Sequence, residues 1–476
     1  MKIEKIYKKI ASIILLSNIF LISCPVVAMA ESDEAINCSV LFKENVVDKS
    51  VEDIVQQSGG KVLTELDYIG GLEIEINPSI ISELMEQASI KSVTPTHTIM
   101  LDSLESDENA EDEAFNSAVY EKYHWDINRV TDNENSYNIQ TGSKDVVVGI
   151  IDSGVDTKHP DLINNFMGVT NFVPKKFKGD DTETGDSSDI EDRYGHGTNV
   201  AGIIAANGNT KGVAPDIGFK SYRIFNDIGQ TTPTICARAI IKATNDDVKV
   251  INLSIGSYDL KGKCYWTDSK TGKTYKLSDD MADYGLLKRA ISYAIKNGVV
   301  VVSSAGNEGQ DCSNKRDLTS YLNNKFNKQG FKYEALTYQA PASIKGVISV
   351  SATSKNDTIA SYSNYGKNFI DIAAPGGDKQ DFCFTTDLNG GYALQRGTSF
   401  AAPKVSAVAA LILCENNTLS PKEVAKVMYK NADKVSKSDS QYCGAGIVNA
   451  NKTLEFLKNS KKIKNIDFYL LFIEFM

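Results

Sequence analysis

This sequence of 476 residues lacks an excess of basic residues, cysteines spaced as metal ligands, and a C-terminal apolar run long enough to cross a membrane. Each absence excludes a class of protein. Basic residues are not in excess: 51 Lys and Arg stand against 61 Asp and Glu, for a net charge of −10. Because nucleic-acid binding depends on Lys and Arg at the phosphates, we expect no nucleic-acid partner. The eight cysteines lack metal-ligand spacing. The apolar residues 468–476 are too few to cross a bilayer, which takes about 20 residues.

The first 30 residues have the pattern of a signal peptide. Four lysines precede an apolar stretch at residues 10–27, and Ala28-Met29-Ala30 fits a cleavage site. Such a segment predicts a secreted, extracellular protein, in which disulfide bonds are permitted. A second interpretation stays open, because residues 21–24 resemble a bacterial lipoprotein box that would place a lipid anchor on Cys24.

Acidic residues are concentrated after this segment. Residues 31–115 hold 20 Asp and Glu against 4 Lys, whereas residues 116–476 hold 40 Asp and Glu against 43 Lys and Arg. Seven carboxylates between Asp102 and Glu113 predict an exposed linker. We therefore expect four parts: a signal peptide at 1–30, an acidic domain and linker at 31–115, a main domain at 116–458 and a tail at 459–476.

The acidic part has the pattern of a small α+β unit over residues 36–101. Alternating apolar residues predict strands at 38–42 and 71–76, and helical periodicity predicts helices at 50–57 and 79–87. This unit would precede the main domain along the chain.

Three motifs of the main domain place an Asp, a His and a Ser at the ends of buried elements. A β-branched run ends at Asp152, His196 opens a small-residue helix, and Ser399 begins a long apolar helix. A serine hydroxyl attacks a carbonyl when a base takes its proton, and imidazole suits that task when a carboxylate orients it. The order Asp, His, Ser therefore predicts a catalytic triad.

A fourth motif contains Asn307, directly after the buried strand pattern at residues 299–302. Its side-chain amide can donate a hydrogen bond to the oxyanion that forms during attack, with the backbone N–H of Ser399 as the second donor. Thr398 is expected to shape the turn before the serine.

Buried strands alternate with helices from residue 145 onward, which predicts an α/β fold with a mainly parallel sheet and helices on both faces. Active groups of such folds lie at the carboxyl ends of the strands. Two polar stretches, 258–281 and 310–339, are expected to be irregular surface insertions. The predicted strands are 145–151, 248–254, 298–303, 346–351 and 369–373, and the predicted helices are 196–206, 233–244, 284–297, 399–413 and 421–431.

The four motifs resemble those of the subtilases, the subtilisin-like serine proteases, and the resemblance extends from about Trp125 to about Leu457. Softer matches at 184–190 and 222–225 are similar to the lantibiotic leader peptidases of that family. The resemblance implies a subtilisin-like fold and a serine endopeptidase that works through an acyl-enzyme. It implies a lantibiotic precursor as the peptide substrate, and we expect a monomer.

By the same resemblance, residues 36–101 look like the inhibitory prodomain of subtilases. Such a prodomain blocks the cleft with its own C-terminal segment. We expect it to be a partner of the main domain and to be removed by autoprocessing between Met100 and Tyr120.

The resemblance also implies that a substrate binds as an added strand between two edges of the protein. One edge is Ser254, Ile255 and Gly256, and the other lies around Asp227, Ile228 and Gly229. A cluster of carboxylates before His196 permits two interpretations, a solvated loop or an acidic rim that favours a basic residue beside the scissile bond. Glu334 is a candidate for a carboxylate in the specificity pocket. The cluster comprises Asp180, Asp181, Glu183, Asp186, Asp189, Glu191 and Asp192.

The sequence gives weaker indications for metal ions and disulfide bonds than for the catalytic residues. Catalysis of this kind needs no cofactor, and the resemblance implies that Asp161 could ligate a structural Ca²⁺. The loop at residues 207–212 is too short to supply the usual further ligands, so the metal ligands stay unknown. A disulfide between Cys264 and Cys312 is a hypothesis among the 15 pairings that six cysteines allow. His159 is expected to hydrogen-bond within its own turn.

Two other functions compete with leader cleavage. One is a broad-specificity extracellular subtilisin. The other is a binding protein on an inactive protease scaffold, against which the intact set of Asp152, His196, Ser399 and Asn307 argues.

Overall fold

The computed structural model describes residues 35–101, 120, 122–277, 279–436 and 439–460. The predicted signal peptide with Cys24, nearly all of the acidic linker and most of the tail lie outside the described residues.

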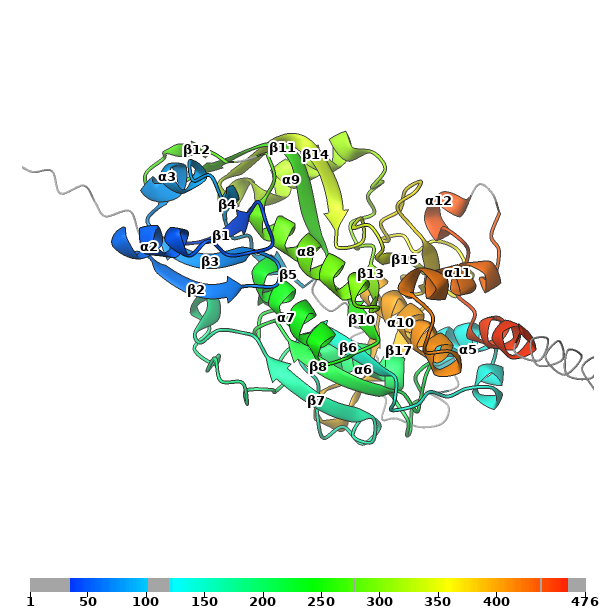
Figure 1. Ribbon diagram of the computed structural model, residues 1–476. Coiled ribbons are helices and arrows are strands. Elements are labelled where there is room, and N and C mark those ends of the chain that lie inside the picture. The colour runs from blue at the N-terminus through cyan, green and yellow to red at the C-terminus, as the bar shows by residue number, and fades with distance from the viewer. Residues whose placement is uncertain (1–34, 102–119, 121, 278, 437–438, 461–476) are drawn as a thin grey trace, which may run out of the picture.

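Seven parallel strands form the central sheet, in the order β16-β15-β13-β10-β6-β8-β7 (Figure 1). Every residue of β10 and β13 is buried, as expected for strands covered on both faces. The predicted parallel sheet is confirmed. Its strands are β6 (Val147–Asp152), β7 (Phe166–Asn171), β8 (Gly218–Arg223), β10 (Val250–Leu253), β13 (Val300–Ser304), β15 (Ile348–Thr353) and β16 (Ile372–Pro375).

Helices pack on both faces of this sheet and create two cores. Successive side chains of a strand point to opposite faces, so Val301 joins the core under α7 and α8, whereas Val300 and Val302 join the core under α6 and α10. By length and composition α10 could cross a membrane, but most of it is buried inside the protein. The helices are α5 (Trp125–Thr131), α6 (His196–Ala205), α7 (Pro233–Asn245), α8 (Ala282–Lys296), α10 (Thr398–Glu415), α11 (Pro421–Asn431) and α12 (Ser440–Cys443).

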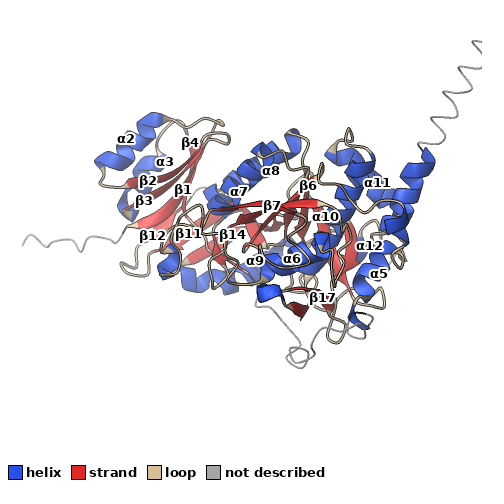
Figure 2. Ribbon diagram, turned by 90° about the horizontal axis from the view of Figure 1, so that it is seen from below, coloured by secondary structure: helices blue, strands red, loops and turns tan. Residues whose placement is uncertain are grey.

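Residues 35–101 form a separate α+β unit, hereafter the N-terminal unit. Its antiparallel sheet has the order β2-β3-β1-β4, and it stands beside α7 and α8 at one end of the molecule (Figure 2). The unit contains β1 (Ile36–Phe42), α2 (Lys49–Gln57), β2 (Lys61–Leu66), β3 (Gly71–Ile76), α3 (Ile81–Met85), β4 (Ile90–Pro95) and β5 (Ile99–Met100).

The N-terminal unit and the main domain share one apolar core. Val40, Leu41 and Leu72 of the unit are in one cluster of buried residues with Leu286 and Ile291 of α8. A burial of this kind stabilises the contact by about 25 cal/mol for each Å² of apolar surface removed from water.

The two stretches that we expected to be irregular insertions are ordered, and that prediction is wrong. They form the sheet β12-β11-β14 and helix α9, with Tyr258, Trp266 and Tyr333 buried. The pairing of β11 with β14 joins residues far apart in the sequence, for example Ser257 with Ala340, so no local pattern announces it. The elements are β11 (Ser257–Thr267), β12 (Thr274–Lys276), α9 (Lys315–Phe326) and β14 (Phe331–Ala340).

The hypothesis of a disulfide between Cys264 and Cys312 is also wrong, because all the described cysteines are free. The Sγ of Cys264 lies 3.9 Å from the backbone oxygen of Tyr265, and that of Cys312 lies 3.8 Å from the backbone oxygen of Gln310. Each thiol is thus directed to a carbonyl of its own segment.

The sequence patterns missed β7 and β8. Strand β8 carries Lys220, Ser221 and Arg223 among its apolar residues, so it lacks the continuous apolar run of the other strands. Arg223 is nevertheless fully buried because Glu183 pairs with it there.

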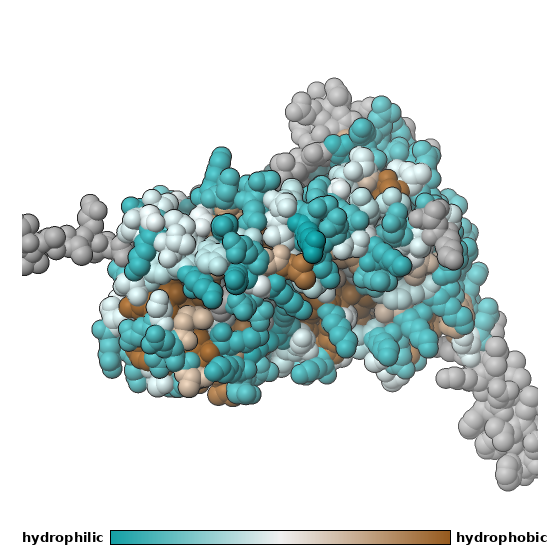
Figure 3. Space-filling view, turned by 90° about the horizontal axis from the view of Figure 1, so that it is seen from above, coloured by the Kyte–Doolittle hydropathy of each residue, from teal (hydrophilic) through white to brown (hydrophobic). Residues whose placement is uncertain are grey.

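The face seen in Figure 3 is largely hydrophilic, and its hydrophobic residues occur in small, separate patches. Isolated exposed apolar side chains of this kind are normal for a protein surface. Two short antiparallel pairings complete the described structure. One is the hairpin of β17 (Cys383–Thr386) with β18 (Tyr392–Gln395), and the other joins β5 of the N-terminal unit to β9 (Gln230–Thr231) of the main domain.

Candidate active site

Asp152 and His196 meet at the carboxyl end of the parallel sheet. Asp152 is the last residue of β6, and His196 is the first of α6 after Gly195, whose φ of 94° favours glycine. The Nδ1 of His196 lies 2.7 Å from Oδ1 of Asp152, and both side chains are buried. The same carboxylate oxygen accepts the backbone N–H of Ser153 at 2.8 Å. The carboxylate therefore fixes the ring with Nε2 as the nitrogen available for proton transfer.

Ser399 is the second residue of α10, across from β10. Its Oγ lies 3.3 Å from the backbone oxygen of Ser254, and the Ser254 hydroxyl donates to the backbone oxygen of Ser399 at 2.8 Å. The ring of Phe400, the next residue, lies 5.5 Å from the His196 ring between centroids. The serine is thus held at the start of a helix, where free backbone N–H groups favour negative charge.

Asn307 is oriented by Thr398. Its Oδ1 accepts the backbone N–H of Thr398 at 2.9 Å and the Thr398 hydroxyl at 2.8 Å. Because a backbone N–H can only donate, this end of the amide must be the oxygen, and Nδ2 is left as the donor. Gly397 precedes Thr398 with a φ of 152°, a backbone conformation that favours glycine.

A pocket joins these residues to the predicted substrate edge. Ser254, Ile255 and Gly256 line it together with Asn307 and Ser399. The structure thus brings the first predicted edge to the serine.

The second predicted edge is occupied by the N-terminal unit. β5 pairs antiparallel with β9, and the N–H of Leu101 donates to the backbone oxygen of Gly229 at 2.8 Å. Met100 and Leu101 also line the pocket that contains Ser399. The pairing uses Gly229 and β9, whereas Ile228 of the predicted edge is 54% exposed.

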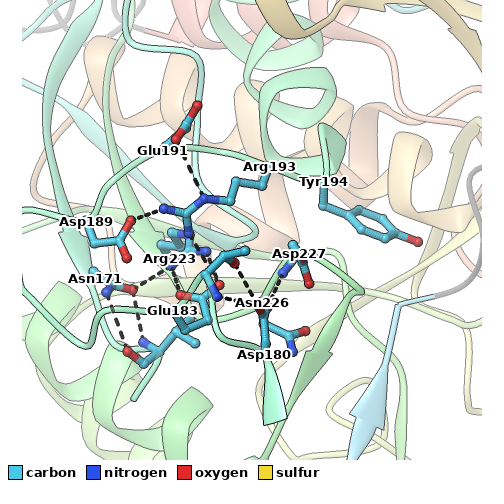
Figure 4. A network of polar contacts seen from close by, with 12 residues as sticks. Asn171, Asp180, Glu183, Asp189, Glu191, Arg193, Tyr194, Arg223, Asn226 and Asp227 are labelled. Carbon is cyan, nitrogen blue, oxygen red and sulfur yellow. Dashed lines mark hydrogen bonds and ion pairs between the residues drawn. The ribbon is translucent and has the colours of Figure 1, made fainter. Parts of the chain in front are cut away.

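The acidic cluster before His196 divides into internal and exposed members. Figure 4 shows Glu183 against Arg223 and Asp189 against Arg193. The buried Arg223 donates from Nη1 to Glu183 at 2.8 Å, which ties the end of β8 to the loop beside Asp152. Only the remaining exposed members, Asp181, Asp186 and Glu191 among them, can form an acidic rim.

Asp192 is part of neither a solvated loop nor an acidic rim. It accepts the N–H of Gly195 at 2.8 Å, and the N–H of Thr198 at 3.0 Å. It thereby satisfies donors at the start of α6 and steadies the helix that carries His196. The sequence feature that could have predicted this role is the position of Asp192, four residues before the histidine that begins the helix.

Glu334 does not supply a pocket carboxylate, and that prediction is wrong. It lies on β14, exposed, and pairs with Lys332 at 3.1 Å. Glu308 lines the pocket instead; its oxygens accept the Tyr258 hydroxyl at 2.8 Å and the Asn364 amide at 2.7 Å. Burial, and then the charge of Glu308, raise the pKa of Tyr258 well above its usual value, so this hydroxyl acts as a donor.

Asp161 does not fit the role of a calcium ligand in this arrangement. Its Oδ1 accepts the N–H of Asn209 at 3.0 Å, and its Oδ2 accepts the N–H of Thr210 and the hydroxyl of Tyr392, each at 2.9 Å. A Ca²⁺ site needs oxygen acceptors around the ion, whereas donors surround this carboxylate. His159 bonds within its own turn as expected, with its Nδ1 accepting the N–H of Asp161 at 3.1 Å. Its Nε2 also lies 2.9 Å from the backbone oxygen of Gly391, outside that turn.

A family model described as "Subtilase family" matches residues 143–446. The chain belongs to the subtilase family and is a serine endopeptidase.

The relatives it matches include two named proteases. The chain is 30% identical over 441 residues to the epidermin leader peptide-processing serine protease EpiP of Staphylococcus epidermidis, with 87% of this chain and 90% of the relative covered. It is 35% identical over 340 residues to the nisin leader peptide-processing serine protease NisP of Lactococcus lactis. That match covers 67% of this chain and 48% of NisP, so the chain spans about half the length of that relative.

Solved structures of the same two kinds of protease are similar to this chain in fold. The crystal structure of EpiP from Staphylococcus aureus superposes with a TM-score of 0.75 at 30% identity, covering 88% of this chain and 98% of that one. The crystal structure of NisP from Lactococcus lactis superposes with a TM-score of 0.62 at 33% identity, covering 70% of this chain and 94% of that one. The subtilisin-like fold is thereby confirmed.

Proposed function

We infer that this protein is a secreted, monomeric protease that removes the leader peptide from a lantibiotic precursor. The observation that carries this proposal is the match to EpiP along nearly the whole length of both chains, 87% of this one and 90% of the relative. The general subtilisins match less closely, at 27% identity for subtilisin E.

In this proposal Ser399 is the nucleophile, His196 the general base and then acid, and Asp152 the residue that orients the imidazole. Ser399 attacks the scissile carbonyl while Nε2 of His196 takes its proton, and the same proton then passes to the leaving amine. Water completes the cycle by hydrolysing the acyl-enzyme. Asn307 and the backbone N–H of Ser399 stabilise the oxyanion.

The N-terminal unit acts as a prodomain that blocks the cleft. Its strand β5 takes the place of an added substrate strand on β9, with Met100 and Leu101 in the pocket of Ser399. A substrate cannot pair with the same edge while β5 is there. Cleavage between Met100 and Tyr120, followed by departure of the unit, would free the edge.

The preference for a basic residue beside the scissile bond is assigned to Glu308 in place of Glu334. Glu308 follows Asn307 directly and lines the same pocket. Lys325 lines the same pocket and pairs with the Glu308 carboxylate at 3.3 Å, so a basic side chain of the substrate would have to take the place of Lys325.

The test compares a lantibiotic precursor with casein, each incubated with the processed protein and with the Ser399→Ala variant. We expect one cut at the leader junction, intact casein and no cleavage by the variant. Rapid degradation of casein would favour the broad-specificity subtilisin instead. Equal cleavage by Ser399→Ala would refute the assigned nucleophile.

A further inference from the structure

His97 of the N-terminal unit is inserted into a socket of the main domain. The side chain is 1% exposed, and its ring stacks on Phe331 with 4.0 Å between centroids. The rings of Phe326 and Tyr284 lie 6.0 Å and 5.7 Å from it. Three separate elements, α8, α9 and β14, therefore build the socket around one imidazole.

The socket recognises hydrogen-bond donors. Oδ2 of Asp283 lies 3.0 Å from the backbone nitrogen of His97 and 3.0 Å from its Nδ1. The Nε2 of the ring lies 2.7 Å from the Tyr333 hydroxyl. Stacking and hydrogen bonds thus select a planar ring that donates from its edge.

His97 supplies two of the hydrogen-bond donors to Asp283. Its other oxygen accepts the N–H of Tyr284 at 2.9 Å, and the carboxylate is fully buried. No Lys or Arg in the described parts of the chain forms an ion pair with it. A buried carboxylate that loses its donors is costly, so Asp283 will favour a replacement donor when His97 leaves.

The path from the socket to the active site is short and extended. Only Thr98 separates His97 from β5, which pairs with β9, and Leu101 lies in the pocket of Ser399. Extended chain rises about 3.3 Å per residue, so roughly 13 Å separate His97 from Leu101. A substrate that replaces β5 on the same edge would carry a residue to the socket in the same register.

We propose that the socket of Asp283, Phe331 and Tyr333 is a remote substrate subsite of the processed enzyme, which binds a planar N–H-donating side chain, an imidazole, four residues before the position of Leu101. The N-terminal unit fills this subsite with His97, and a substrate fills it afterwards. This inference rests on the proposed function, because it takes β5 as the stand-in for a substrate strand. The proposal gives the sheet β12-β11-β14 and helix α9 a role in substrate selection, because β14 supplies Phe331 and Tyr333.

The experiment titrates octapeptides into the Ser399→Ala protein after added protease has cut the linker and has digested the N-terminal unit, with its loss verified by mass spectrometry. The parent peptide has the sequence of residues 94–101, and its variants carry His97→Ala or His97→Phe. We expect calorimetry to show binding of the parent and about tenfold or weaker binding of both variants. The His97→Phe peptide keeps the stacking and the backbone N–H, and it loses the hydrogen bonds of the ring to Asp283 and Tyr333.

The same titrations with Asp283→Asn protein should reduce the difference between the parent and His97→Phe peptides to about threefold or less. Asp280→Asn is the matched control, because Asp280 pairs with Lys91, which the peptides lack, and it should preserve the tenfold difference. Equal binding of the parent and His97→Phe peptides, an undiminished difference with Asp283→Asn, or no binding of the parent would overturn the proposal. Calorimetry needs no turnover, so this result is independent of whether the precursor is cleaved.

Discussion

At the residue scale, the orientation of Asn307 makes its amide nitrogen the expected donor to the oxyanion. Replacing it with alanine removes that donor, and we expect kcat to fall by about 10²–10³, a magnitude established for a subtilisin itself. KM should change little, because the interaction forms only as charge develops on the oxygen. Steady-state kinetics on a peptide substrate measure both constants.

Asn356→Ala provides the control for this substitution. Asn356 is exposed on a turn, so the same change there should leave kcat within about twofold. A rise in KM at constant kcat for Asn307→Ala would show that Asn307 binds the ground state and would contradict the oxyanion role.

His124 is a residue whose burial makes stability depend on pH. Its ring stacks on Tyr120 at 4.2 Å, and neither ring nitrogen has a hydrogen-bond partner among the described residues. Burial lowers the pKa of His124 to about 4. The unfolded chain, with a pKa of about 6.5, therefore binds the proton more readily between these two values.

The free energy of unfolding is therefore not reduced by His124 above about pH 6.5. It decreases as the pH falls from there toward 4, by up to about 1.4 kcal/mol per pH unit. His124→Phe keeps the stacking and removes the titration. We expect the unfolding temperature to drop less between pH 7 and pH 4.5 in this variant than in the parent. Equal drops would show that His124 is not the group that titrates.

At the scale of elements, a buried ion pair ties α5 to the serine-bearing helix α10. Nζ of Lys404 lies 2.7 Å from Oδ2 of Asp126, and both side chains are fully buried. The same ammonium donates to the backbone oxygen of Phe400 at 2.9 Å, one residue after Ser399. The pair therefore connects the segment that follows the linker to the start of the helix that carries the serine.

Lys404→Met leaves the charge of Asp126 buried without its partner, and we expect it to cost about 3–5 kcal/mol of unfolding free energy. Adding Asp126→Leu should restore most of that loss, since two apolar side chains need no partner. Lys242→Met, which breaks a partly exposed pair with Asp246, should cost less than about 1 kcal/mol. Denaturant unfolding measures all three, and a double variant no more stable than Lys404→Met would contradict the assignment.

At the scale of the whole molecule, Arg289 fastens the N-terminal unit to the main domain. Its guanidinium donates to the backbone oxygens of Phe42 at 2.7 Å, Lys43 at 3.0 Å, Glu44 at 3.0 Å and Ile69 at 2.7 Å. These carbonyls belong to the end of β1, the loop that follows it and the loop between β2 and β3, so one side chain holds all three segments.

We expect Arg289→Ala, made in the Ser399→Ala protein, to speed hydrogen exchange at the amides of β1 and β3 by about tenfold or more. Protection in β10 and β13 should stay the same, because the parallel sheet does not depend on this contact. Lys296→Ala, an exposed change on the same helix, serves as the control. Unchanged exchange in β1 would show that the apolar contact alone holds the unit.

The sequence predicted the elements whose apolar residues form a continuous run or recur with the period of a strand or helix. The helix at residues 421–431 and the strand at 71–76 match α11 and β3 to the residue, and the other core elements differ by a few residues at their ends. Gly and Ser at the starts of α6 and α10 marked the turns where His196 and Ser399 lie. These patterns are local, because a residue's own neighbours decide them.

What the chain encodes locally is thus the set of reactive groups, the alternation of strands with helices, and the class of chemistry that Asp152, His196, Ser399 and Asn307 can perform. The tertiary structure alone decided that residues 257–267 and 331–340 pair as strands, that His97 enters a socket beside Asp283, and that Glu308 rather than Glu334 lines the pocket. The physical reason is the distance along the chain. The cost of burying a carboxylate or an imidazole is set by partners that folding brings from distant segments, and no pattern of neighbouring residues reports them.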